Sequence, residues 1–172
     1  MNFKRSVVAF SALAILVWFE QGAAQVPPNC LVETATNPDR QVLKCAFGLT
    51  LELEAAAELE FSSEVLATEP TEITLQNGAV FIDVEPGAAR PQIRTPHAIA
   101  AVRGTVYLID VSFETTSVFV VEGEVSVSRS GDQAESITLR SGEGVDVTAG
   151  FDLEVKTWPA SRSQALLARF GK

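Results

Sequence analysis

The chain is poor in the residues on which most catalytic and metal sites depend. Its 172 residues include one histidine, one tyrosine and two cysteines. A general base or a metal ligand needs partner side chains, and His97 is the only histidine. The sequence also lacks a Gly-x-Ser-x-Gly elbow and a phosphate-binding P-loop. A hydrolase needs a nucleophile and a base together, so we expect no enzyme, no cofactor and no metal site.

Positive charge is scarce as well. The chain has 13 lysines and arginines against 22 aspartates and glutamates, and its formal net charge is −9 at pH 7. Nucleic-acid binding rests on a basic surface that neutralises phosphates. The charge balance therefore argues against a nucleic-acid partner. Acidity favours solubility and says little about the fold.

No apolar run reaches the roughly 20 residues of a spanning helix. The longest, Val7 to Phe19, follows Lys4 and Arg5 and is followed by the small residues Gly22 to Ala24. A basic start, a short apolar stretch and small residues are typical of a secretory signal peptide. We expect residues 1–24 to be removed and the protein to be periplasmic or secreted, with no membrane span after cleavage. An uncleaved anchor is the alternative.

The two cysteines, Cys30 and Cys45, follow this segment and lie 15 positions apart. Export makes a disulfide between them plausible. Closing a loop of this length stabilises by about 3 kcal/mol in the chain-entropy model. Two free buried thiols are the alternative. A lipoprotein is not expected, because Pro27-Pro28-Asn29 before Cys30 does not resemble a lipoprotein signal. Residues 25–40, rich in Pro, Asn and Thr, are expected to form an extended leader tethered by Cys30.

The remaining chain has the composition of β-strands. Thr95 to Val127 is the longest stretch dense in β-branched residues, which suit a pleated, half-buried surface. In Val118 to Val121 both sides of a strand are apolar, and the same holds for Ile99 to Val111, so we expect burial on both faces. A core helix is the alternative for short apolar runs.

An earlier segment alternates leucine with glutamate. Leu49 to Glu54 has its leucines on one face, and Leu59 and Phe61 continue the pattern. Because Ala and Glu favour helix, a helix from Glu52 to Glu60 is the competing assignment, but the alternation favours strands. The glutamates of this segment are interpreted as the solvated face of a sheet, in preference to a cation site.

Glycines recur at the head of Val-rich units. Gly78, Gly104, Gly123 and Gly142 each precede such a unit, at spacings of 26, 19 and 19 residues, and Gly48 heads an earlier leucine-rich copy. Glycine supplies positive φ at tight corners, and stacked units bury a core that one unit cannot. The pattern predicts an all-β domain over 41–157, built as a twisted β-helix or solenoid-like stack of short strands. A β-sandwich with hairpins is the alternative.

The end of the chain differs in pattern. Phe151 to Thr157 is expected to form a last strand, and Pro159 breaks it. Ser161 to Gln164 matches a capping box, which predicts a short helix over Ala165 to Phe170 within a tail of 158–172. We expect this helix to cover the open end of the strand stack and so to protect a strand edge.

Four motifs in order resemble the FecR domain family, named for the ferric dicitrate sensor. They are Ile93-Arg-Thr-Pro96 through Val102-Arg-Gly-Thr105, Val121-Glu-Gly-Glu-Val125, Leu139-Arg-Ser-Gly-Glu143 and, upstream, Leu75-Gln-Asn-Gly-Ala-Val80. The resemblance is best over residues 73–147. It implies an all-β, β-helix-like domain in the periplasm of a Gram-negative bacterium.

Full-length sensors of that family carry a cytoplasmic segment that regulates a sigma factor, and they receive a signal from an outer-membrane receptor through protein contact. Few residues precede the apolar run here, so we expect no cytoplasmic segment and a stand-alone exported domain. The resemblance implies a protein-interaction or signal-sensing module whose partner is another, unidentified envelope protein.

Five residues of the motifs are predicted to be structural: Arg103, Gly104, Thr105, Gly123 and Gly142. Arg103 stands between apolar neighbours, and it braces a corner or contacts a partner. Asp83 and Asp110 each end a Val-rich unit, where they could pair across neighbouring units or bond a turn.

An envelope glycan is the alternative partner. Sugar-binding surfaces usually need exposed aromatic rings, and this chain has few. Trp158 is the only tryptophan after residue 24, and Tyr107 lies in a core-like run. The glycan-binding function therefore ranks below protein binding.

Overall fold

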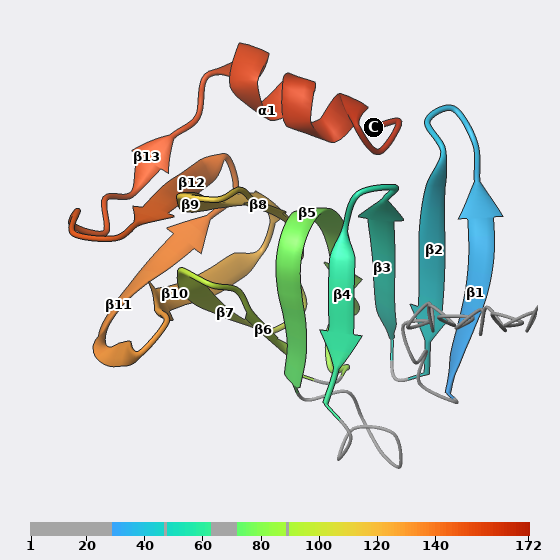
Figure 1. Cartoon of the computed structure of the whole chain (residues 1–172), viewed down its shortest axis with the longest axis horizontal. Helices are drawn as coiled ribbons and strands as arrows, with labels where there is room; N and C mark the ends of the chain where they lie inside the picture. Colours follow the sequence, from blue (N-terminus) through green and yellow to red (C-terminus); the bar gives the residue numbers. More distant parts are fainter. Residues whose placement is uncertain (1–28, 47, 63–71, 89) are drawn as a thin grey trace, which may run out of the picture.

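The computed structural model describes residues 29–46, 48–62, 72–88 and 90–172, so the predicted signal peptide, 1–24, lies outside the described residues. The described chain is almost entirely β-structure with one helix near its end (Figure 1). The elements are β1 (Cys30–Ala35), β2 (Arg40–Cys45), β3 (Leu49–Glu54), β4 (Glu58–Phe61), β5 (Glu72–Val84), β6 (Gln92–Arg94), β7 (Ala98–Val102), β8 (Val106–Val111), β9 (Thr115–Glu122), β10 (Glu124–Arg129), β11 (Asp132–Arg140), β12 (Glu143–Thr148), β13 (Lys156–Thr157) and α1 (Ala160–Ala168).

The long strand β5 joins two layers of a curled sheet. Its first half pairs with β4 and β6, and its second half pairs with β3 and β8. Gly78 lies where the partners change and has φ +80°, and a Cβ there would lie 2.7 Å from the Cα of Ala57. Glycine is therefore required for the strand to turn from one layer into the other. One layer continues through β6, β7, β10 and β11, and the other through β8, β9, β12 and β13.

The recurring glycines mark crossings between these layers. Gly104 lies between β7 and β8, Gly123 between β9 and β10, and Gly142 between β11 and β12; each pair of strands belongs to different layers. The predicted tight corners are present, but the units do not stack as solenoid coils. The strand pairs are antiparallel apart from β5 with β6, among the described residues. Antiparallel pairing of two facing layers is closer to the sandwich alternative.

Two apolar cores lie on opposite faces of the layer that contains β8, β9, β12 and β13. The inner core lies between the two layers and includes Val80 and Ile82 of β5. The outer core lies beneath α1 and consists of Ala79, Phe81, Leu108, Phe119, Trp158, Leu166 and Phe170. The predicted burial of Val118 to Val121 on both faces is largely confirmed: Val118 and Val120 face the inner core, Phe119 faces the outer core, and Val121 is half-buried against the outer core. The same prediction is wrong for Ala101, which is exposed.

The leucine–glutamate segment forms strands, as predicted, with the turn 55–57 between β3 and β4. The interpretation of its glutamates is half wrong. Glu58 and Glu60 are exposed, but Glu52 is only 8% exposed and Glu54 is half-buried. The end of the chain folds back over this face of the sheet, so basic side chains meet these two carboxylates in place of water.

The ends of the β domain also differ from the sequence-based boundaries. The described part of the predicted leader contains β1, which pairs along its full length with β2, so the described sheet includes residues from Cys30 onward. The last strand is shorter than expected, because β13 covers only Lys156–Thr157. The sheet therefore incorporates part of the presumed leader, and most of the predicted last strand is irregular.

The helix begins earlier than predicted. Pro159 is its N-cap residue and makes no side-chain capping bond, and Ser161 lies inside the helix, so the capping-box prediction is wrong. Leu166 and Phe170 pack into the outer core, as expected for one apolar side. Figure 1 shows α1 beside the layer that contains β8, β9 and β12. The helix covers a face of the sheet, and not an edge, because its apolar side chains contact residues that point out of β5, β8 and β9.

Candidate functional site

The two glycine motifs meet at one corner between the layers. The Thr105 hydroxyl donates a hydrogen bond to the Glu124 carbonyl oxygen at 2.8 Å, and Thr105 is 1% exposed. A Cβ on Gly123 would lie 2.8 Å from the Gly104 carbonyl oxygen. Gly104 itself has φ +61° and lies against Pro86. The two motifs, which are distant in sequence, therefore meet in a tight backbone contact that leaves no space for side chains at Gly104 and Gly123.

Arg103 lies beside this corner, next to Gly104 in the sequence. Its side chain is exposed, and it forms no hydrogen bond or ion pair with the described residues. It borders a shallow hollow of about 460 Å³ together with Ser126 and Thr138. Within the described residues the Arg103 side chain makes no contact that would brace the corner, and its contact with a partner stays a prediction.

Gly142 and the two aspartates make contacts of their own. The N–H of Gly142 donates to the Val120 carbonyl oxygen at 2.9 Å, at the crossing into β12. Asp83 and Asp110 do not pair, because they lie opposite Val106 and Ala79 in the register of β5 with β8. Of the two alternatives for these residues, pairing of the carboxylates is therefore wrong, and Asp110 accepts a hydrogen bond from Arg169.

Strand β1 forms a free edge within the described part of the sheet. Among the described strands it pairs with β2 alone, and Figure 1 shows it at the outer end of its layer. Leu31 is 72% exposed and Val32 is 48% exposed. Unpaired backbone groups beside exposed apolar side chains form a template on which another strand can pair.

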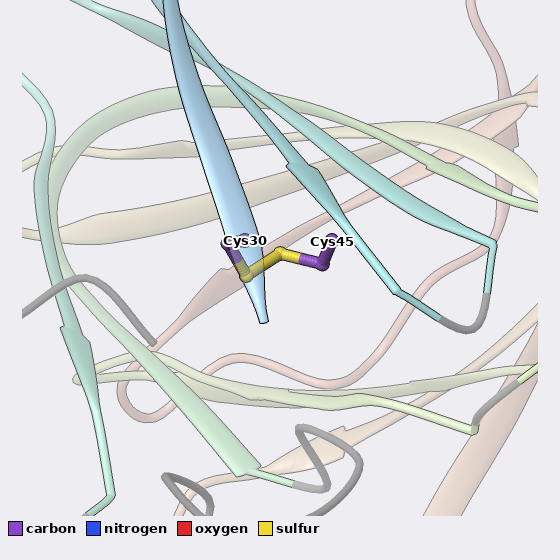
Figure 2. The surroundings of a disulfide bond; sticks show 2 residues. All are labelled: Cys30 and Cys45. Atoms are coloured by element: carbon purple, nitrogen blue, oxygen red, sulfur yellow. A yellow bond between two sulfur atoms is a disulfide. The ribbon is translucent and has the colours of Figure 1, made fainter. Parts of the chain in front are cut away.

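A disulfide between Cys30 and Cys45 fixes this edge strand. It joins the start of β1 to the end of β2, where the two cysteines are direct register partners with Cα atoms 3.9 Å apart (Figure 2). Diagonally across the same two strands, Glu33 of β1 and Lys44 of β2 form an exposed ion pair of 2.7 Å. The edge is therefore a preformed strand.

Ion pairs attach the end of the chain to the outer face. The Arg169 guanidinium donates to Glu54 Oε1 at 2.6 Å and to Asp110 Oδ2 at 2.6 Å. Burial alone would lower the pKa of Arg169, but the hydrogen bonds to Asp110 and Glu54 outweigh it and raise the pKa. Arg169 thus bridges two strands that are distant in sequence.

Glu52 is held by two cations. Lys172 Nζ lies 2.7 Å from one of its carboxylate oxygens, and Arg40 Nε lies 2.6 Å from the other. Burial tends to raise the pKa of Glu52, yet hydrogen bonds from Lys172 and Arg40 outweigh burial and lower it. This carboxylate is therefore charged and paired beneath the chain end.

Arg162 forms the third attachment. Its Nη1 donates to Asp146 Oδ2 at 2.8 Å, and the Ser117 hydroxyl donates to Asp146 Oδ1 at 2.6 Å. The hydrogen bond from Arg162 lowers the pKa of Asp146. The guanidinium also stacks over Trp158, 3.5 Å from the ring centre. We refer to the attachments of Arg162, Arg169 and Lys172 as the polar clamp.

No metal-ligating cluster is present within the described segments. No group of three His, Cys, Asp or Glu side chains converges there. The helix found in those segments is too short to cross a lipid bilayer. What the described surface offers is a free strand edge, a corner with an exposed arginine, and a clamped helix.

Sequence comparison decides the family. The FecR protein family matches residues 31–126. This chain belongs to that family. The matched region begins earlier and ends earlier than the 73–147 estimated from the motifs, and its first residue lies in β1. The free edge is therefore part of the FecR region itself.

The fold is similar to that of a solved protein. A protein from Parabacteroides distasonis, proposed to be an anti-sigma factor, was solved by crystallography at 1.65 Å and again at 2.50 Å. Both structures superpose with a TM-score of 0.60 at 17% sequence identity, over 80% of this chain. The present chain spans 64% of that protein's length. A search of curated protein sequences finds no match.

Proposed function

We propose that this FecR-family protein is a non-enzymatic, signal-sensing module of the cell envelope that acts by binding another protein. Its family membership and its fold, shared with a protein proposed to be an anti-sigma factor, support a regulatory role. Export to the periplasm is part of the proposal and rests on the N-terminal sequence pattern.

The free edge of β1 is the observation that carries this proposal. An extended segment of a partner adds to such an edge through backbone hydrogen bonds, and pockets or apolar contacts for alternate side chains give specificity. Leu31 and Val32 supply exposed apolar surface on this strand. Since the disulfide already holds β1 against β2, ordering the strand adds little to the cost of binding.

Site-specific photocrosslinking in living cells tests the edge. A photoreactive residue at Leu31 is expected to trap a discrete envelope protein, whereas the same residue at Phe113 is not. Phe113 is a matched control because it is 95% exposed and lies in the turn between β8 and β9, away from the edge. Leu31→Lys should abolish a crosslink placed at Thr34. Equal crosslinking at Leu31 and Phe113 contradicts the proposal.

The proposed export has its own measurement. Intact mass of periplasmic protein should correspond to a chain that starts at Gln25 and contains one Cys30–Cys45 bond. A mass that retains residues 1–24 contradicts cleavage after Ala24, without affecting the edge.

Glycan binding is a second candidate function, but not at Trp158 or Tyr107. Trp158 is 6% exposed and Tyr107 is fully buried, so neither ring can receive a sugar. Phe151, which is 69% exposed, borders two hollows.

A further inference from the structure

Three turns meet around a hollow of about 470 Å³. They are the turn before β7, the hairpin turn between β10 and β11, and the turn after β12. The N–H of Ser130 donates to the His97 carbonyl oxygen at 2.9 Å, and Arg129 Nη1 donates to the Thr148 carbonyl oxygen at 3.0 Å. The three turns are therefore held together by hydrogen bonds, and the hollow between them is defined by the fold.

The imidazole of His97, at the border of this hollow, has a fixed tautomer. Thr95 Oγ1 lies 2.9 Å from the Ala98 carbonyl oxygen, which can only accept, so the Thr95 hydroxyl donates to it. The Thr116 hydroxyl, 2.9 Å from Thr95 Oγ1, must then donate to Thr95. With its proton so used, Thr116 accepts from His97 Nδ1 at 3.1 Å. The neutral ring is thus protonated on Nδ1, and its Nε2 is an acceptor that this network does not use.

Other polar side chains of the hollow have hydrogen-bonding groups that no described residue uses. Glu135 and Asp152 form no ion pair with the described residues. Arg129 uses one N–H on Thr148, and its remaining donors have no partner in the described chain. The hollow therefore offers both acceptors and donors within a small volume. Hydroxyl groups, which donate and accept at once, match such a mixture best.

An exposed aromatic ring joins this hollow to a second one. Phe151 lines both, and the second has a volume of about 650 Å³ and includes Lys156 and Glu154. Both volumes lie in the range of about 300–1,000 Å³ that ligand sites occupy. Leaving a phenyl ring 69% exposed forgoes the gain of burying it, so a ligand with an apolar face gains by covering it.

We propose that the two hollows that share Phe151 bind a neutral carbohydrate chain. A sugar ring has an apolar C–H face that stacks on an aromatic ring and hydroxyls that pair with His97 Nε2, Arg129 and the carboxylates. The carboxylates around both hollows, with the net charge of −9, disfavour an anionic polymer. A peptide is less suited to this site. Extended peptides often bind by pairing with a free strand edge, and these hollows are bordered by turns and side chains instead. The site is separate from the β1 edge and does not depend on it.

Titration of the full protein by NMR tests the site. The probes are three neutral tetrasaccharides (chitotetraose, maltotetraose and cellotetraose) and the peptide tetra-alanine. At least one sugar is expected to give saturable shifts of the backbone amides of His97, Arg129 and Phe151. Phe151→Ala should weaken that binding about tenfold. Phe113→Ala, which removes another exposed ring, should leave it unchanged.

A pair of histidine variants separates ligand contact from folding. His97→Asn keeps a donor near Thr116 but removes the acceptor at the Nε2 position, whereas His97→Gln places a polar atom near Nε2. We expect the Asn variant to bind several-fold more weakly than the Gln variant, with equal melting temperatures. Absence of saturable shifts with all three sugars, or binding of tetra-alanine in their place, overturns the proposal; so does binding that Phe151→Ala leaves intact.

Discussion

The inner and outer cores use opposite faces of the same strands but are closed in different ways. On β5, Ile82 faces the inner core and Phe81 the outer core. The inner core is closed by two layers of paired strands, whereas the outer core is closed by a nine-residue helix and the polar clamp. Isolated helices of this length are marginal in water, so α1 depends on its docking. We therefore expect the outer core to open while the sheet persists.

Neighbouring substitutions on β5 should separate the two cores most strongly. Ile82→Ala removes a fully buried side chain between the layers and is expected to lower the free energy of unfolding by about 2–5 kcal/mol. Phe81→Ala should act mainly on α1, by exposing its amides to hydrogen exchange. Denaturant unfolding with exchange mass spectrometry measures both effects. Equal loss of protection across sheet and helix in both variants contradicts two separable cores.

The layer crossings test whether the inner core needs its glycine corners. Gly123 and Gly142 both have positive φ, but a Cβ meets the Gly104 carbonyl oxygen at Gly123 and finds no described atom within 4 Å at Gly142. Gly123→Ala is therefore expected to destabilise by about 1–3 kcal/mol more than Gly142→Ala. Melting followed by circular dichroism checks this. Similar melting temperatures of the two variants mean that backbone strain alone, and not the closed corner, matters.

Acid should loosen the outer core before the inner one. The folded-state pKa values of Glu52 and Asp146 lie below their ordinary values of 4.5 and 3.8. A lowered pKa contributes stability that is fully present above the ordinary value and is lost as pH falls through the folded-state pKa. Below about pH 4.5 the polar clamp therefore weakens, by about 1 kcal/mol.

The pH effect is measured as amide exchange of α1 relative to β5 over a series of acidic buffers. Glu52→Gln removes one of the two titrating groups, so its helix should respond less to pH. An α1 whose relative protection is the same at neutral and acidic pH contradicts a role for these carboxylates in docking.

The smallest effect is expected at Tyr107. Its ring is fully buried in the inner core, and its hydroxyl has no hydrogen-bond partner among the described residues. Burial raises the pKa of this hydroxyl, which stays protonated. An unpaired buried hydroxyl costs free energy, so Tyr107→Phe should leave stability unchanged or raise it by up to about 1 kcal/mol. A clear loss in denaturant unfolding shows that the hydroxyl has a partner, such as bound water.

Parts of the candidate sites were accessible from sequence. The paired cysteines and their export context predicted the disulfide, and the glycine motifs predicted corners. The free edge was missed because β1 has no period-2 pattern and was assigned to a leader. The polar clamp was missed as well, because Arg169 and Glu54 are 115 positions apart and no local pattern connects them.

Most of the strands and turning points, though not β1 or the extent of β13, follow from the local sequence, because alternation of side chains and positive φ are properties of neighbouring residues. Only the tertiary structure decided where the turns lead. The glycine units cross between two antiparallel layers and do not stack, since the choice of partner strand depends on contacts made across the whole domain. Glu52 shows the same limit: its period-2 position predicts a solvated face, and the chain end folding over the sheet converts that face into a buried, charged one.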